Sequence, residues 1–283
     1  MPTLRGVAGA FPCTTNASPI FPCHVRQNIF SNDKDRARGP LRKATVCSKP
    51  LEGRTLMTDE VLPFDPLLAR HVKAKSLEPH QRPTSPGLRT ACDFYQQYML
   101  KHPFLSLFHT YTQLLHACLL EGDAKVISYV PHPFLLLIRK KRYSPDCYIV
   151  SEGQPRRVVE LIPEGKMPDH EKLPLIAFFK QFRMVFEVIS NESVLARERE
   201  ALNWLEIVHI LHQARQFTTT DAEQQVLEKL TAVGPCTLGE VIDTGDRERT
   251  YLLEIALFRL LHRGYLSADL REFTLDYDTE VTL

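Results

Sequence analysis

Two short strand-like segments joined by a turn constrain the fold of this chain more than any other feature. Residues 143–150 and 156–163 are rich in β-branched and aromatic side chains, and the Glu-Gly-Gln-Pro sequence at 152–155 is typical of a turn. The pattern predicts a β-hairpin in which Asp146 begins the first strand and Glu160 lies late in the second. Antiparallel pairing brings these two carboxylates to one end of the sheet. Such a pair suits a divalent cation that promotes phosphodiester hydrolysis, so both are candidate metal ligands and catalytic residues. If the site is active, the expected cofactor is Mg²⁺ or Mn²⁺.

The charge of the chain is unevenly distributed. Lys and Arg number 35 against 34 Asp and Glu over 283 residues. Residues 1–56 hold nine basic and three acidic residues, a net +6, so the remainder carries −5 against +1 for the whole chain. Any contact of the remainder with DNA is therefore expected from a local basic patch.

The first 88 residues have little pattern. Residues 1–56 are rich in Pro, Asn, Ser, Thr and Arg, which predicts a disordered basic leader. The Met-Thr-Asp-Glu sequence at 57–60 resembles a natural start, so this leader is either an over-extended gene start or a basic arm that anchors DNA. Residues 57–88 are expected to be an irregular linker. The seven cysteines form no C-x-x-C pair, which favours a reducing compartment such as the cytoplasm. No apolar run approaches the ~20 residues that a membrane span needs.

The rest of the chain divides into an α/β part and a smaller C-terminal part. In the first, hydrophobic periodicity predicts helices at Pro103–Glu121, Glu171–Phe182 and Ala201–Ala214, and strands at Lys125–Val130, Phe134–Arg139, Asp146–Val150, Arg156–Ile162 and Met184–Ser190, with Asn191 as a helix N-cap. From residue 218 onwards, three helices precede a predicted hairpin over 265–270 and 272–275. That order suggests a winged helix-turn-helix.

Motifs in this order resemble the TnsA family, the endonuclease subunits of heteromeric bacterial transposases. The resemblance covers about residues 100–283 and is carried by LEGDAKV at 120–126, HPF at 132–134, SPDC at 144–147, ELIP at 160–163, FEVI at 186–189 and LNWL at 202–205. It implies a restriction-endonuclease-like domain of the PD-(D/E)xK type over 89–217, followed by a winged-helix domain over 218–283. It also implies metal-dependent cleavage at transposon ends, with DNA, an integrase-type transposase subunit and an AAA+ transposition regulator as partners. The implied location is the bacterial cytoplasm at the nucleoid, without a membrane.

Two residues depart from the family pattern. Gln113 stands where the first helix normally supplies Glu, and Ile162 replaces the active-site lysine. Gln113 is expected to serve as a neutral oxygen ligand beside Asp146 and Glu160. Ile162 lies on the same strand face as Glu160 but offers no cation. The protein is therefore either an endonuclease in which another lysine, at 140, 141 or 166, compensates, or a catalytically impaired version that binds DNA and partners.

A basic run, Arg139 to Arg142, directly precedes the Pro-Asp strand. Lys140, Lys141 and Arg142 are candidate DNA-phosphate contacts at the entrance of the site, although basic loops are often only solvated. In the C-terminal part, arginines 247, 249, 259 and 263 suggest DNA reading, but the apolar content of the same helix favours protein docking. The competing hypothesis is a winged-helix DNA-binding regulatory protein that retains an inactive nuclease fold.

Overall fold

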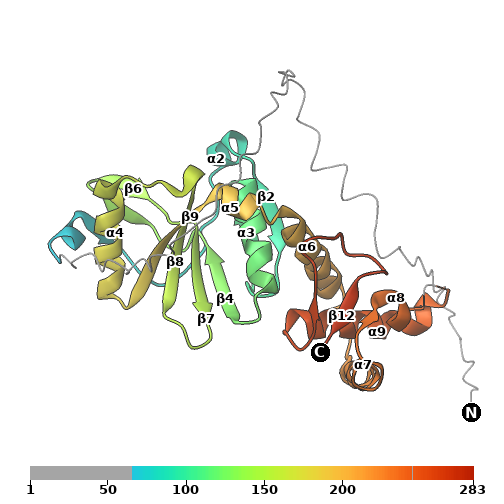
Figure 1. The fold of residues 1–283 in the computed structure, drawn as a ribbon. Helices are drawn as coiled ribbons and strands as arrows, with labels where there is room; N and C mark the ends of the chain where they lie inside the picture. Colours follow the sequence, from blue (N-terminus) through green and yellow to red (C-terminus); the bar gives the residue numbers. More distant parts are fainter. Residues whose placement is uncertain (1–65, 244) are drawn as a thin grey trace, which may run out of the picture. The chain divides into compact units, whose positions relative to one another are not determined.

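A mixed four-stranded sheet, in the order β4-β7-β8-β9, organises the α/β part of the chain (Figure 1). β4 (Val126–Pro131), β7 (Cys147–Ser151) and β8 (Arg156–Ile162) are antiparallel, and β7 and β8 form the predicted hairpin. β9 (Met184–Ser190) runs parallel to β8, which requires the crossover supplied by α4 (Asp169–Gln181). The chain is thus a mixed α/β protein, as predicted.

The computed structural model describes residues 66–243 and 245–283, all within one unit, Val61–Leu283. The leader predicted for residues 1–56 lies outside the described residues. No helix in the described part of the chain is long and apolar enough to span a membrane.

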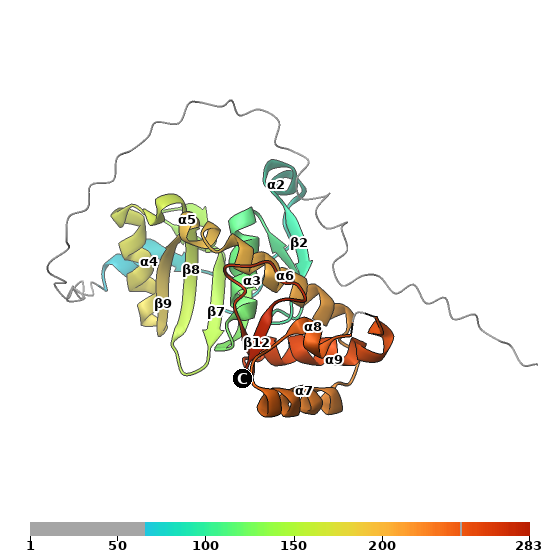
Figure 2. The ribbon, with the colours of Figure 1, turned by 45° about the vertical axis from the view of Figure 1, so that its right-hand side comes forward.

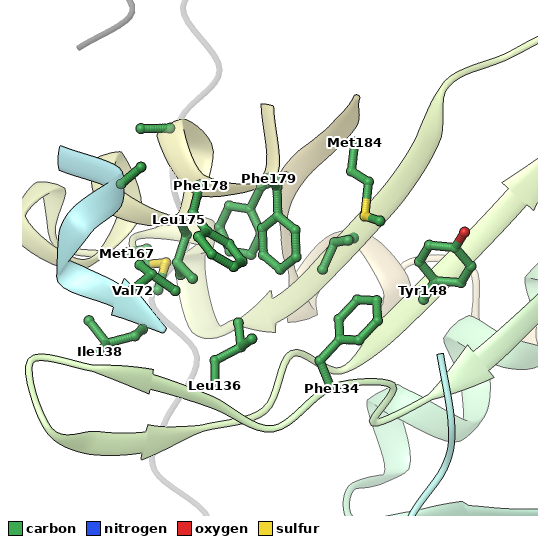
Figure 3. Packing of buried hydrophobic residues seen from close by; sticks show 14 residues of the cluster. Val72, Phe134, Leu136, Ile138, Tyr148, Met167, Leu175, Phe178, Phe179 and Met184 are labelled. Atoms are coloured by element: carbon green, nitrogen blue, oxygen red, sulfur yellow. The ribbon is translucent and has the colours of Figure 1, made fainter. Parts of the chain in front are cut away.

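The expected linker, residues 57–88, contains structure that the sequence analysis missed. The 3-10 helix η1 (Leu68–His71) leads into β1 (Val72–Ala74), and helix α2 (Pro86–Ala91) follows. β1 pairs with β5 (Leu136–Ile138), which pairs with β6 (Lys141–Tyr143), giving a second sheet of three strands. This small sheet packs its apolar face against α4 (Figure 3). A strand of three residues is too short for a periodicity signal, so its partner decides its conformation.

The first predicted helix begins later than expected. Residues 105–108 form strand β3 (Leu105–Phe108), paired with β2 (Tyr95–Tyr98), and the helix α3 spans Tyr111–Gly122. The side chain of Thr110 accepts a hydrogen bond from the Gln113 amide (3.2 Å), so it caps the helix at this point. The prediction of helix from Pro103 was wrong because an apolar stripe was extended through a strand.

The next helices fall close to their predicted positions. α5 (Asn191–Leu195) is capped by Ser190 rather than Asn191, since the Ser190 hydroxyl accepts from the Ser193 amide (3.1 Å). α6 (Glu198–Gln213) then packs against α3, and both lie on the same side of the central strands as the C-terminal elements (Figure 2).

The C-terminal part has the predicted helices but a different arrangement of strands. Its elements are α7 (Thr220–Val233), β10 (Cys236–Thr237), α8 (Leu238–Val241), α9 (Arg247–His262), β11 (Ser267–Ala268) and β12 (Glu280–Thr282). The sheet order is β10-β12-β11, so β11 pairs with residues 280–282 and not with 272–275.

The predicted second strand at 272–275 is absent because Asn203 occupies its backbone groups. The buried Asn203 amide donates to the carbonyls of Leu270 (2.8 Å) and Phe273 (2.7 Å). Its oxygen accepts from the Leu275 amide (3.0 Å). These three bonds satisfy a loop that would otherwise need a strand partner.

One fully buried carboxylate, Glu121 at the end of α3, joins the α/β part to α9. Its Oε1 accepts from the amides of Leu100 (3.1 Å) and Lys101 (3.0 Å) and from the Tyr129 hydroxyl (3.0 Å). Its Oε2 accepts from Nε2 of His262 in α9 at 2.9 Å. Because a buried charge is tolerated only when its hydrogen bonds are satisfied, these partners hold the elements together.

Two glycines bring the backbones of this junction close together. A methyl group on Gly122 would lie 2.2 Å from the Trp204 indole nitrogen, so only glycine fits against this ring. Gly264, just after α9, has a φ of +74°, and a methyl group there would lie 2.5 Å from the Ala124 side chain. Both contacts require the absence of a side chain.

Glu121→Ala is expected to destabilise the fold by about 3–5 kcal/mol, because it leaves buried donors unpaired. Glu121→Gln retains an oxygen for the amides of Leu100 and Lys101 and offers a donor to His262, so its loss of folding stability should be about 1 kcal/mol. Urea denaturation of the two variants measures the difference. An equal loss in both would mean that the charge of Glu121, rather than its hydrogen bonds, holds the junction.

Candidate functional site

Asp146 and Glu160 lie together at one end of the central sheet, as the sequence predicted. The last ladder pair of β7 and β8 is Cys147 with Val159, so the next pair brings Asp146 opposite Glu160. The Asp146 amide donates to the Val159 carbonyl (3.0 Å), and its carboxylate Oδ2 accepts from the Leu161 amide (2.7 Å). The ladder therefore fixes the position of both carboxyl groups.

Gln113 reaches this site from the first turn of α3, but its amide is turned away from the role of oxygen ligand. Its Oε1 accepts from the backbone amide of His109 (2.7 Å), and its Nε2 donates to Oδ1 of Asp146 (2.6 Å). Since the His109 amide is only a donor, the orientation of the Gln113 side chain is determined by that contact. Gln113 thus presents a hydrogen-bond donor to Asp146.

Both carboxyl groups resist ionisation. Burial raises the pKa of Asp146, and the hydrogen bonds from Leu161 and Gln113 oppose this in part. Burial also raises the pKa of Glu160, with further contributions from the charge of Asp146 and from Glu171 of α4. A hydrogen bond from the Tyr143 hydroxyl to Oε2 of Glu160 (2.7 Å) opposes the shift of Glu160. No lysine or arginine among the described residues contributes to either shift.

The side chain at the lysine position is partly buried against the hydrophobic core. Ile162 packs against the apolar cluster beneath α4, which also contains Val158 from the same strand face. The candidate substitute Lys166 is exposed and pairs with Glu164 at 2.6 Å. Lys140 and Lys141 are exposed on the turn between β5 and β6 and its following strand. None of these lysines makes a described hydrogen bond to Asp146 or Glu160.

The charge of two carboxylates, Asp146 and Glu160, suits a divalent cation, but two ligands are few for such an ion. Asp146 and Glu160 would hold the ion, and a bound cation would relieve the repulsion that raises their pKa values. However, the described residues contain no group of three or more His, Cys, Asp or Glu placed to hold a metal. A metal would also compete with the amide donors already bound to both oxygens of Asp146.

Three further residues near the site were missed by the sequence analysis. Tyr143 was identified only as a strand residue, and its role as donor to Glu160 depends on the pairing of β6. The rings of His109 and His132 stack with their centroids 4.0 Å apart, and burial with the neighbouring His109 lowers the pKa of His132 to about 3. The His132 amide donates to the Asp146 carbonyl (2.9 Å), so the backbone of His132 lies next to the backbone of Asp146. No sequence spacing indicates this contact.

Two of the four candidate arginines of the C-terminal part are bonded within the fold. Arg259 donates to the Thr219 hydroxyl (2.6 Å) and to the Ala214 carbonyl (3.1 Å), which ties α9 to the start of α7. Arg263 pairs with Glu223 of α7 at 2.7 Å. Two of the four arginines proposed to read DNA are therefore engaged in bonds within the protein.

Glu160→Gln is expected to stabilise the protein at pH 8 by about 1–3 kcal/mol and to have no effect near pH 4. A raised pKa means that ionisation of Glu160 is disfavoured in the folded state, so the natural protein loses stability as the pH rises through that pKa. Gln does not ionise, and its oxygen still accepts from Tyr143. Thermal denaturation against pH measures the difference, with the exposed Glu152→Gln as control. A pH-independent difference would contradict this account of the pair.

Comparison of the chain with protein-family models and with curated proteins finds no match. The family of the chain is therefore not established by similarity.

Proposed function

We propose that this protein is a TnsA-like component of a DNA transposition machine whose nuclease-type site is catalytically impaired and serves to bind DNA and partner subunits. The observation that carries the proposal is the meeting of Asp146 and Glu160 at one sheet end, with Gln113 presenting a donor in place of a third ligand. The position of the carboxylates supports the resemblance, and the donor supports the loss of activity.

The arrangement of elements supports the proposed pair of domains. A helix, three antiparallel strands, a crossover helix and a parallel strand place both carboxylates at one sheet end, as expected for the restriction-endonuclease-like domain. In the C-terminal part, helices α7, α8 and α9 with the strand order β10-β12-β11 support the winged helix. The pairing of β11 with residues 280–282, and the lack of a strand at 272–275, are compatible with that interpretation.

The chemistry of the site supports impairment. A nuclease of this kind needs a cation near the attacking water, and general acid–base help of that sort is worth about 10²–10⁴-fold. Ile162 instead offers an apolar side chain that packs against the core. Mg²⁺ or Mn²⁺ would supply Lewis-acid chemistry if bound, and Asp146 and Glu160 must lose their protons to bind it.

The proposed role of the C-terminal part is to dock protein partners, an integrase-type transposase and an AAA+ regulator. Apolar side chains are exposed on α7, on α9 and after it: Val233 is 70% exposed, Leu252 42% and Tyr265 63%. Arg259 and Arg263 are already bonded internally. These observations favour protein docking over the competing role of an autonomous winged-helix DNA reader.

Calorimetric titration with Mn²⁺ is expected to detect only weak binding that strengthens as the pH rises, and none in Asp146→Ala. The natural protein should assemble with the integrase-type transposase of its own element and should not nick transposon-end DNA. Nicking that depends on Asp146 would show a working endonuclease and refute the impairment. Sequence-specific duplex binding without transposase assembly would favour the regulatory protein.

The double variant Gln113→Glu/Ile162→Lys is expected to gain metal-dependent nicking by about 10²-fold or more over the natural protein. It restores a third carboxylate beside Asp146 and a cation on the strand face of Glu160. Gln113→Glu/Ile162→Met is the matched control, because it restores the ligand without the charge. No gain in a folded double variant would mean that the site is not a nuclease site that has lost two residues.

A further inference from the structure

The small sheet β1-β5-β6 has one covered face and one open face. Figure 3 shows Val72, Leu136 and Ile138 directed toward Leu175 and Phe178 of α4. Because strand side chains alternate, the residues between them lie on the opposite face. In the strand register, Lys73 pairs with Leu137 and Leu137 pairs with Arg142, so these three form a row across the open face. All three are exposed.

The open face and its edges carry charge of a single sign. Residues 66–75 and 134–143 contain seven Lys and Arg and no Asp or Glu. All seven are exposed, and none forms an ion pair or a side-chain hydrogen bond with a described residue. We call this set the basic sheet face: Lys73 and Arg142 lie on the open face itself, and Arg70, Lys75, Arg139, Lys140 and Lys141 lie at its edges, with Lys141 opposite Ile138. A cluster of uncompensated cations on a body of net negative charge is suited to a polyanion.

The turn between β5 and β6 displays two of these cations at a conformational cost. Ile138 pairs with Lys141, so the turn consists of Arg139 (φ 46°) and Lys140 (φ 77°), both left-handed. Stability alone would favour Asn-Gly at these positions. The Arg139 amide donates to the His71 carbonyl (3.0 Å), which holds the turn against η1. Strained backbone of this kind is characteristic of functional sites.

The same strand connects this face to the candidate site. Lys141 and Arg142 of β6 are exposed, and the next residue, Tyr143, turns inward and donates to Glu160 (2.7 Å). A DNA backbone bound along β6 is thereby led to the end of the sheet that holds Glu160 and Asp146. The single apolar residue of the row, Leu137, is 40% exposed and offers little surface for insertion into a membrane.

We propose that the basic sheet face binds the phosphodiester backbone of duplex DNA without reading its sequence, and directs it toward Asp146 and Glu160. The guidance of the DNA toward Asp146 and Glu160 rests on the proposed function, whereas the binding of DNA by the basic sheet face does not. The contacts are to phosphates, since lysine and arginine side chains on a flat sheet face supply charge without base-edge specificity. Arg70, Lys73 and Lys75 thus act together with the residues 139–142, from a segment that is remote in the sequence.

The decisive variant is Arg139→Asn/Lys140→Gly, because it moves stability and binding in opposite directions. It relieves two left-handed residues, so Tm should rise by about 2–4 °C. It also removes two phosphate contacts, so the slope of log K against log salt should fall in magnitude by about 2. Fluorescence anisotropy with a short duplex of arbitrary sequence, at several salt concentrations, measures the slope.

A second pair, Lys73→Gln/Arg142→Gln, tests the flat row and should reduce the slope by a similar amount. The matched control is Lys125→Gln/Arg156→Gln, which removes two exposed cations near the β7–β8 turn, at the other end of the central sheet. The control should leave the slope unchanged. Equal slopes in all three variants and the natural protein would overturn the proposal, as would binding to phosphatidylserine vesicles without binding to duplex.

The outcome separates this inference from the proposed function. Duplex binding that depends on the basic sheet face, in a protein that does not assemble with a transposase, would support the inference and remove the transposition role. Transposase assembly together with duplex binding that is insensitive to these variants would retain the role and overturn the inference.

Discussion

The buried carboxylate of Glu121 is the interaction on which the arrangement of this protein depends. It satisfies donors from the 100–101 segment, from β4 and from α9, so three parts of the chain share one side chain. The LEGDAKV motif at 120–126 therefore has a structural role: Glu121 supplies the hydrogen-bond acceptor, and Gly122 leaves room for Trp204. A second motif, at 202–205, supplies both that tryptophan and the Asn203 that holds the loop before β12. Two of the motifs that carry the family resemblance thus meet at one junction.

The central hairpin could be predicted from the sequence because its information is local. Alternating β-branched residues and a turn sequence specify β7 and β8, and the placement of Asp146 opposite Glu160 follows from the register. Strands β1 and β12 could not be predicted, since strands of three residues are stabilised by partners that are distant in the sequence. Strand β3 was missed although its partner β2 is close in the sequence, because its apolar residues continue the stripe of the following helix. The hairpin expected over 265–270 and 272–275 does not form, because Asn203 bonds to the backbone groups of its second segment.

The proximity of Asp146, Glu160 and Gln113 could be predicted, but the direction of their hydrogen bonds could not. Gln113 was correctly placed beside Asp146, yet which atom of its amide faces the carboxylate depends on the backbone of His109. The role of Tyr143 depends on a sheet whose first strand was expected to be irregular. The residue types therefore predict which side chains lie close together. The protonation of the carboxylates and the atom that Gln113 presents to them depend on neighbours that only the fold brings into contact.

Trp204 gives the junction a property of another kind. It is the only tryptophan of the chain, and it lies edge-on to His262 with ring centroids 6.5 Å apart while facing Gly122. Its emission therefore comes entirely from the contact between α3, α6 and α9. The protein therefore carries an intrinsic fluorescent probe at the contact between its α/β part and its C-terminal helices. A partner that loosens this contact will change the wavelength and intensity of the tryptophan emission.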